Sequence, residues 1–139
     1  MDTARHVKGL AFSGLTGSEH WVPMDTKKEV GGITGGPTPM ELVIQALIGC
    51  TGMDVVSILN KMKQEFRSFE VLAEYERSEE HPKVYTKIHM TYRFEADEID
   101  HDKVGKAVKL SKERYCSVSA MLSRSVDITY HIEINGERI

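Results

Sequence analysis

One segment of this 139-residue chain, from Thr38 to about Phe66, has the composition of a helix that is buried on every side. Its first five turns carry apolar side chains all round the helix: Leu42, Val43, Ile44, Leu47, Ile48, Met53, Val55, Val56, Ile58 and Leu59. Thr38, Pro39 and Glu41 match the capping-box pattern that starts a helix, which gives Glu41 a structural role at the N-terminus. A helix that is apolar all round lies inside a protein, so other elements must cover it.

The rest of the chain supplies segments suited to that task. Alternation of apolar and polar residues predicts strands, and a spacing of three or four predicts helices. The first expected elements are a hairpin over 5–24 that turns at 16–18, the long helix, and a longer hairpin over 69–94 that turns at 78–82. A helix from Asp100 to about Tyr115 follows. The last elements are a short helix through Leu122, capped by Ser117 or Ser119, and a strand over 126–134. The order β-β-α-β-β-α-α-β predicts one α+β domain over 1–139, with antiparallel sheets around a long buried central helix.

Charge and composition exclude several classes of protein. The 18 basic and 21 acidic residues are interspersed, and the net charge is −3. Without a basic stripe, neither nucleic acid nor an anionic membrane surface is expected as a partner. The chain does not open on a signal peptide, and Gln45, Gly49, Thr51 and Asp54 interrupt its longest apolar stretch, so we expect a cytoplasmic protein.

Cys50 and Cys116 are the two cysteines of the chain. In a reducing cytosol, cysteines are more often catalytic thiols or buried hydrophobic residues than a permanent disulfide. Cys50 lies between Gly49 and Gly52 in the helical pattern, where two glycines indicate close approach of a substrate or of another backbone. Cys116 precedes a serine-capped helix, whose free amides favour a thiolate. Both thiols could instead be small side chains that fill tight packing sites.

Asp54 places a carboxylate one turn after Cys50 in an otherwise apolar helix. A buried carboxylate needs a partner, so Asp54 should orient an Arg or Lys near the thiol or cap a backbone group elsewhere. A metal site is not expected, because the six histidines are scattered and no CxxC or HExxH motif occurs. No cofactor is expected either.

Three segments carry a family resemblance: residues 37–42, residues 50–59 and residues 115–119. Together with the order of elements and the spacing of the two cysteines, they resemble the OsmC/Ohr family of osmotically inducible and organic hydroperoxide resistance proteins, and most of all its YhfA-like branch. The resemblance covers almost the whole chain.

The resemblance implies an intertwined homodimer that reduces organic hydroperoxides in oxidative-stress defence. It implies that Cys50 attacks the peroxide, that Cys116 resolves the resulting sulfenic acid into a disulfide, and that an external dithiol reduces the disulfide. Active members hold an activating arginine with a glutamate ten residues before the first cysteine. Met40 occupies that position here and Glu41 follows it, so Glu41 and Asp54 are the acidic candidates for the site.

Two other functions agree with the same residues. One is a non-catalytic OsmC-like dimer that binds a small hydrophobic ligand in a pocket at the dimer interface. The other is a structural or stress-response dimer in which both cysteines are simply buried. The sequence leaves open the substrate, the reductant and whether Cys50 and Cys116 form a disulfide.

Overall fold

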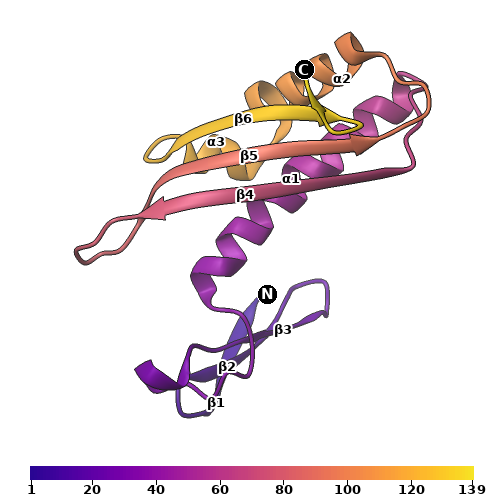
Figure 1. The fold of residues 1–139 in the computed structure, drawn as a ribbon. Helices are drawn as coiled ribbons and strands as arrows, with labels where there is room; N and C mark the ends of the chain where they lie inside the picture. Colours follow the sequence, from indigo (N-terminus) through magenta and orange to yellow (C-terminus); the bar gives the residue numbers. More distant parts are fainter. The chain divides into compact units, whose positions relative to one another are not determined.

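A computed structural model describes all 139 residues, which group into two compact units, Met1–Gln45 and Ala46–Ile139. The first unit holds a three-stranded antiparallel sheet of β1 (Thr3–Lys8), β2 (Ala11–Leu15) and β3 (Trp21–Met24), in that order (Figure 1). The sequence predicted a single hairpin here. The additional strand arises because Gly9, at a φ of 56°, lets the chain reverse between β1 and β2.

A glycine-rich loop follows β3 and contains the short 3₁₀ helix η1 (Lys28–Val30). The buried Asp25 carboxylate organises this loop, because one of its oxygens accepts hydrogen bonds from the amides of Ile33 (3.0 Å) and Gly35 (2.8 Å). Gly32 passes so close to the Thr26 carbonyl that a Cβ atom would collide with it. Gly32 is therefore needed here for close backbone packing.

The long helix α1 spans Pro39–Lys61 and begins with the predicted capping box. The Thr38 amide donates to Glu41 Oε2 at 2.7 Å, and the Glu41 amide donates to Thr38 Oγ1 at 3.2 Å. The helix ends five residues earlier than predicted, since Lys63 adopts a left-handed conformation at a φ of 56°. Residues 62–66, which the sequence predicted as the end of the helix, form the turn that leads to the second sheet.

Burial of α1 follows one stripe rather than the whole circumference. Along the stripe lie Ile44, Leu47, Thr51, Val55 and Leu59, all buried. The opposite side, with Ala46, Gly49, Met53 and Ser57, is exposed. By length and composition alone α1 could cross a membrane, but core helices of other proteins pass the same test. A single chain thus leaves one side of its most apolar helix uncovered.

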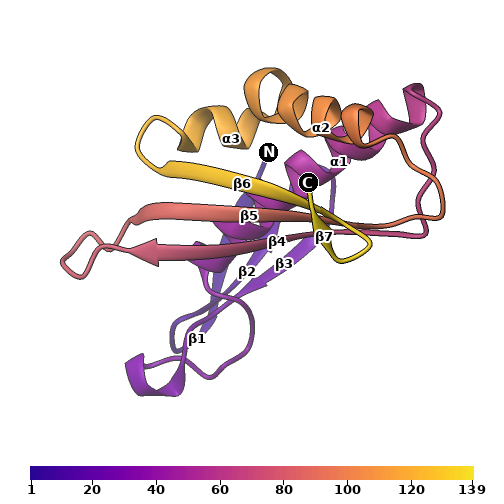
Figure 2. The same cartoon turned by 45° about the horizontal axis from the view of Figure 1, so that its top comes forward.

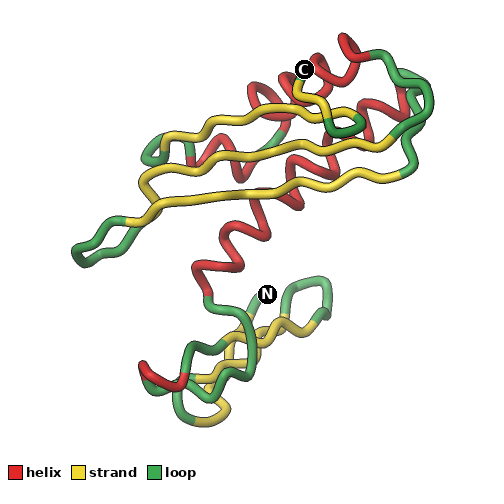
Figure 3. The backbone as a smooth tube through the Cα atoms, in the orientation of Figure 1, coloured by secondary structure: helices red, strands yellow, loops and turns green.

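The second unit is a four-stranded sheet with helices on one face (Figures 2 and 3). Across the sheet, the strands lie in the order β4 (Ser68–Arg77), β5 (Tyr85–Glu95), β6 (Asp127–Ile134) and β7 (Glu137–Arg138). The helical elements are α2 (His101–Leu110), the π-helical turn η2 (Ser111–Tyr115) and α3 (Ser117–Leu122). Ile88, Met90, Tyr92 and Phe94 on alternate positions of β5 are fully buried beneath the helices. The α+β class and the second hairpin are as predicted.

The direction of β6 adds a parallel pair to the antiparallel pairs that the hairpins predicted. β6 pairs with β5 in parallel, in a register that places Ile88 beside Ile128 and Tyr92 beside Ile132. Parallel neighbours need a crossover connection, and α2, η2 and α3 provide it. This crossover brings Cys116 over the face of the sheet that α1 also covers.

Candidate active site

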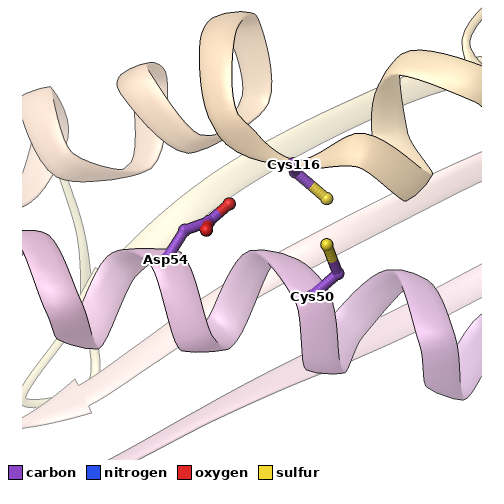
Figure 4. A group of neighbouring side chains, drawn as sticks. All are labelled: Cys50, Asp54 and Cys116. Carbon is purple, nitrogen blue, oxygen red and sulfur yellow. The ribbon is translucent and has the colours of Figure 1, made fainter.

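Three side chains that the sequence singled out meet on one side of α1. Cys50 and Asp54 lie one turn apart on the helix, and Cys116 comes from the junction of η2 and α3 (Figure 4). The sulfur atoms and a carboxylate oxygen all lie within 4.8 Å of one another. Both cysteines are free thiols, and their sulfur atoms point toward each other.

Cys116 is buried and fixed by the backbone around it. It is itself the N-cap of α3, in place of the predicted Ser117 or Ser119, and its Sγ accepts a hydrogen bond from the Ser119 amide at 3.3 Å. Its own amide donates to the Ser111 carbonyl at 2.8 Å, which closes the π-helical turn. Burial, followed by the neighbouring Cys50 thiol and the Asp54 carboxylate, raises the pKa of Cys116 to about 11 against the opposing effect of the Ser119 amide. Cys116 is therefore a protonated thiol at neutral pH.

Asp54 has a hydroxyl as its partner, where the sequence predicted a cation or a backbone group. Its Oδ2 accepts a hydrogen bond from Ser111 Oγ at 3.0 Å. Ser111 Oγ also lies 2.8 Å from Thr51 Oγ1, which lies 2.7 Å from the Tyr92 hydroxyl. This hydroxyl chain links Asp54 to the buried core, and burial raises the pKa of Tyr92 to about 12.

Cys50 is the more accessible of the two thiols. It is half-buried, and a Cβ atom at its neighbour Gly49 would meet nothing within 4 Å. On the other side, a Cβ atom at Gly52 would lie in ordinary contact distance of Val71 and Phe69 on β4. The two glycines thus have different surroundings, since one packs on the sheet and the other borders open space next to the thiol.

A pocket of about 330 Å³ adjoins the cluster and has Asp54 in its wall. The other lining residues are Ser57, Ile58, Lys61, Met62, Leu110 and Tyr115. Most of these side chains are apolar, and Lys61 supplies a cation at the helix end. A larger hollow of about 900 Å³ lies near Phe66 and Asp97 and contains none of the three cluster residues. Its size alone does not connect it with the thiols.

Glu41 does not belong to the cluster. Its carboxylate is engaged with the Thr38 amide in the capping box. The polar groups in contact with the cluster are the Ser111 hydroxyl and the Ser119 amide, and neither is a cation. The cluster therefore joins two thiols and a carboxylate without a positive partner from its own chain.

Comparison with known proteins places the chain in a family. The sequence profile described as "OsmC-like protein" matches residues 31–131, which include both cysteines. The chain belongs to the OsmC-like family. Protein YhfA of Escherichia coli K12 is 40% identical over 130 residues, which cover 92% of each chain. The resemblance seen in the sequence is thus confirmed.

Solved structures agree on the OsmC-like fold. A hypothetical protein from Aquifex aeolicus VF5 is similar with a TM-score of 0.81 and 28% identity over 97% of this chain and 96% of that one. An organic hydroperoxide resistance protein OsmC from Legionella pneumophila is similar with a TM-score of 0.67 over 96% and 94% of the two chains. At 15% identity, the second likeness concerns the fold alone.

Sequence reasoning missed Thr51, Ser111 and Tyr92, which connect Asp54 to the core. Thr51 lies next to Cys50 and carries a hydroxyl in an apolar helix, which was the one available signal. Ser111 lies 60 residues from Thr51 in the sequence, and Tyr92 lies 41 residues away. Nothing in the local sequence around Ser111 or Tyr92 indicates that they meet.

Proposed function

We propose that this OsmC-like protein reduces organic hydroperoxides with its two thiols, as a cytoplasmic defence against oxidative stress. The observation that supports the proposal most is the pair of free thiols, Cys50 half-buried and Cys116 buried, with their sulfur atoms within 4.8 Å of each other. The difference in burial supports this order of action: the thiol that a substrate can reach acts first. The accessible Cys50 meets the peroxide, and the buried Cys116 waits for the oxidised product.

In the first step the Cys50 sulfur attacks one peroxide oxygen and the O–O bond breaks. The alcohol leaves with a proton, and Cys50 becomes a sulfenic acid. In the second step the Cys116 sulfur attacks the Cys50 sulfur, which gives a disulfide and water. An external dithiol then reduces the disulfide by exchange and returns both thiols.

Asp54 is the proposed proton carrier of the second step. Cys116 is protonated at neutral pH, so its proton must leave as the sulfur attacks. The Asp54 carboxylate lies within 4.8 Å of both sulfur atoms and can pass that proton to the departing hydroxide. Ser111 keeps the carboxylate in place through its 3.0 Å hydrogen bond.

The pocket beside Asp54 is the proposed site for the organic part of the substrate. Ile58, Met62 and Leu110 in its wall suit an alkyl or aromatic group better than they suit hydrogen peroxide. The alternative function, binding of a small hydrophobic ligand without turnover, would use the same pocket. Native mass spectrometry of the purified protein separates the two, since a retained ligand adds mass to the folded chain.

The exposed side of α1 supports a homodimer. Ala46, Gly49, Met53 and Ser57 on this side are uncharged, and Met53 is 76% exposed in the single chain. A partner chain that covered this side would remove apolar surface from water. We therefore propose that the protein acts as a homodimer with α1 at the interface.

Consumption of cumene hydroperoxide tests the proposed activity. With dithiothreitol or a lipoylated reductant, the purified protein should consume the peroxide over many turnovers, and Cys50→Ser should not. A sulfenic-acid probe should label Cys50 when peroxide is added without reductant. A protein that neither consumes the peroxide nor reacts with the probe at Cys50 would refute the activity.

A further inference from the structure

The three side chains of the cluster all become anionic when they lose a proton. Cys50, Asp54 and Cys116 offer two sulfur atoms and one carboxylate oxygen within 4.8 Å, and no Lys, Arg or His forms an ion pair with Asp54. Three such groups repel one another when all of them are ionised. They can lie this close together if they stay protonated or share a cation. A divalent cation would supply the positive charge that no ion pair with Asp54 supplies.

We propose that the reduced protein binds one zinc ion per chain through Cys50 Sγ, Cys116 Sγ and one Asp54 carboxylate oxygen, with water as the fourth ligand. This inference uses the residues of the proposed function but does not depend on peroxide chemistry. It revises the expectation of no metal site, which rested on motifs of closely spaced ligands. Cys116 lies 66 residues after Cys50 in the sequence and reaches the site through the crossover.

The geometry suits a tetrahedral metal. Zinc bonds of about 2.3 Å to sulfur and about 2.0–2.2 Å to oxygen separate neighbouring ligand atoms by roughly 3.5–3.8 Å. The three atoms in the structure lie within 4.8 Å of one another, so small side-chain rotations could complete the site. Figure 4 shows the two sulfur atoms directed into the same space, with the carboxylate beside them. Thiolate ligands favour zinc over magnesium or calcium, which prefer oxygen.

A hydrogen bond from a neighbouring side chain holds the Asp54 carboxylate, as outer contacts do in known metal sites. Ser111 Oγ holds Asp54 Oδ2 at 3.0 Å and is itself fixed by Thr51 at 2.8 Å. Such outer contacts orient a carboxylate ligand and leave its second oxygen for the metal. The pocket of about 330 Å³ that reaches Asp54 gives an ion an entry path.

Binding and oxidation exclude each other at this site. When Zn²⁺ binds, the two thiols lose two protons to solvent, and the site with its carboxylate carries a net charge of −1. When a peroxide oxidises the pair to a disulfide, both thiolate ligands are consumed and the zinc ion must leave. The reduced protein therefore holds the zinc ion and releases it on oxidation.

Titration of the full-length reduced protein tests the inference. In competition with a chromophoric chelator, the wild-type protein should bind one Zn²⁺ per chain. With Co²⁺ as a spectroscopic probe, it should give the thiolate-to-metal charge-transfer absorption of a tetrahedral site. Cys50→Ser should lose the stoichiometric binding, and Ser111→Ala should weaken it by roughly 10- to 100-fold. Circular dichroism checks that each variant is folded.

Two controls distinguish this site from others. Asp127→Asn changes an exposed aspartate on β6 and should bind zinc as the wild type does. His131→Ala removes a histidine that lies near His89 and Glu133, and it should also bind normally. If wild-type protein gives no charge-transfer band, or if His131→Ala abolishes binding while Cys50→Ser does not, the inference is overturned. Peroxide turnover by metal-free protein is measured in parallel, so that failure of either proposal is seen separately.

Discussion

At the scale of single residues, the burial of Cys116 determines how its thiol behaves. Its pKa is raised to about 11 from an ordinary value of 9.0, so the folded chain holds its proton more tightly than the unfolded chain. The resulting stabilisation is fully present below about pH 9 and is lost as the pH rises through about 11. The Cys116→Ser variant lacks this buried thiol, so its stability does not change with pH in this way.

We therefore expect the free energy of unfolding of reduced wild-type protein to fall between about pH 8 and about pH 10.5 more steeply than that of Cys116→Ser. Urea unfolding at both pH values measures the difference. Tyr92 is present in both proteins, and its raised pKa of about 12 lies above this pH range, so it contributes little to the difference. Parallel curves for the two proteins would show that the buried thiol is not perturbed as described.

The buried hydroxyl of Thr51 permits a second prediction at this scale. It bonds the Tyr92 hydroxyl at 2.7 Å and Ser111 Oγ at 2.8 Å. Thr51→Val keeps the shape but leaves Tyr92 without its hydroxyl partner, at a cost of about 1–3 kcal/mol in unfolding free energy. In the double variant with Tyr92→Phe, the unpaired hydroxyl is gone, so the summed cost should fall. Strictly additive costs would mean that the two hydroxyls are not coupled.

At the scale of elements, the glycine-rich loop of the first unit depends on Asp25. Backbone amides, Gly35 first, lower the pKa of its carboxyl group, so its contribution to stability is present above about pH 4 and is lost as the pH falls through the lowered pKa. Asp25→Asn should lower the melting temperature at neutral pH, and the difference from wild type should shrink in acid. Thermal unfolding followed by circular dichroism at several pH values tests this, with Asp127→Asn as the control. A difference that is constant with pH would contradict it.

Most elements could be predicted from the sequence because their signals are local. The capping box of α1 depends on residues three apart, and the hairpin of β4 and β5 follows from simple alternation. The parallel pairing of β6 could not be predicted in this way, because alternation is the same for both strand directions. Cys50, Cys116 and Asp54 could each be chosen as candidates from their local context. These three residues lie close together because the crossover carries η2 over α1. No local sequence pattern predicts that crossover.

At the scale of the whole molecule, the uncovered side of α1 connects stability with assembly. Met53 is 76% exposed in the single chain and lies on the same side of α1 as the uncharged, exposed Gly49 and Ser57. Met53→Glu would place a charge in the proposed dimer interface, whereas Met53→Leu would keep the surface apolar. Sedimentation equilibrium should find a dimer for the wild type and for Met53→Leu, and a monomer or a much weaker dimer for Met53→Glu. A monomeric wild type, or three equally stable dimers, would refute this interface.

The intact mass of the protein after treatment with one equivalent of cumene hydroperoxide tests most directly whether the two thiols form a peroxidatic pair. The wild type should lose two hydrogen atoms per chain, with a Cys50–Cys116 disulfide in the non-reducing digest. Cys116→Ser should instead gain one oxygen atom at Cys50, because the resolving thiol is absent. If the peroxide is not consumed and both masses stay unchanged, or if the oxygen appears on Cys116 in a Cys50→Ser chain just as readily, the assigned roles are wrong.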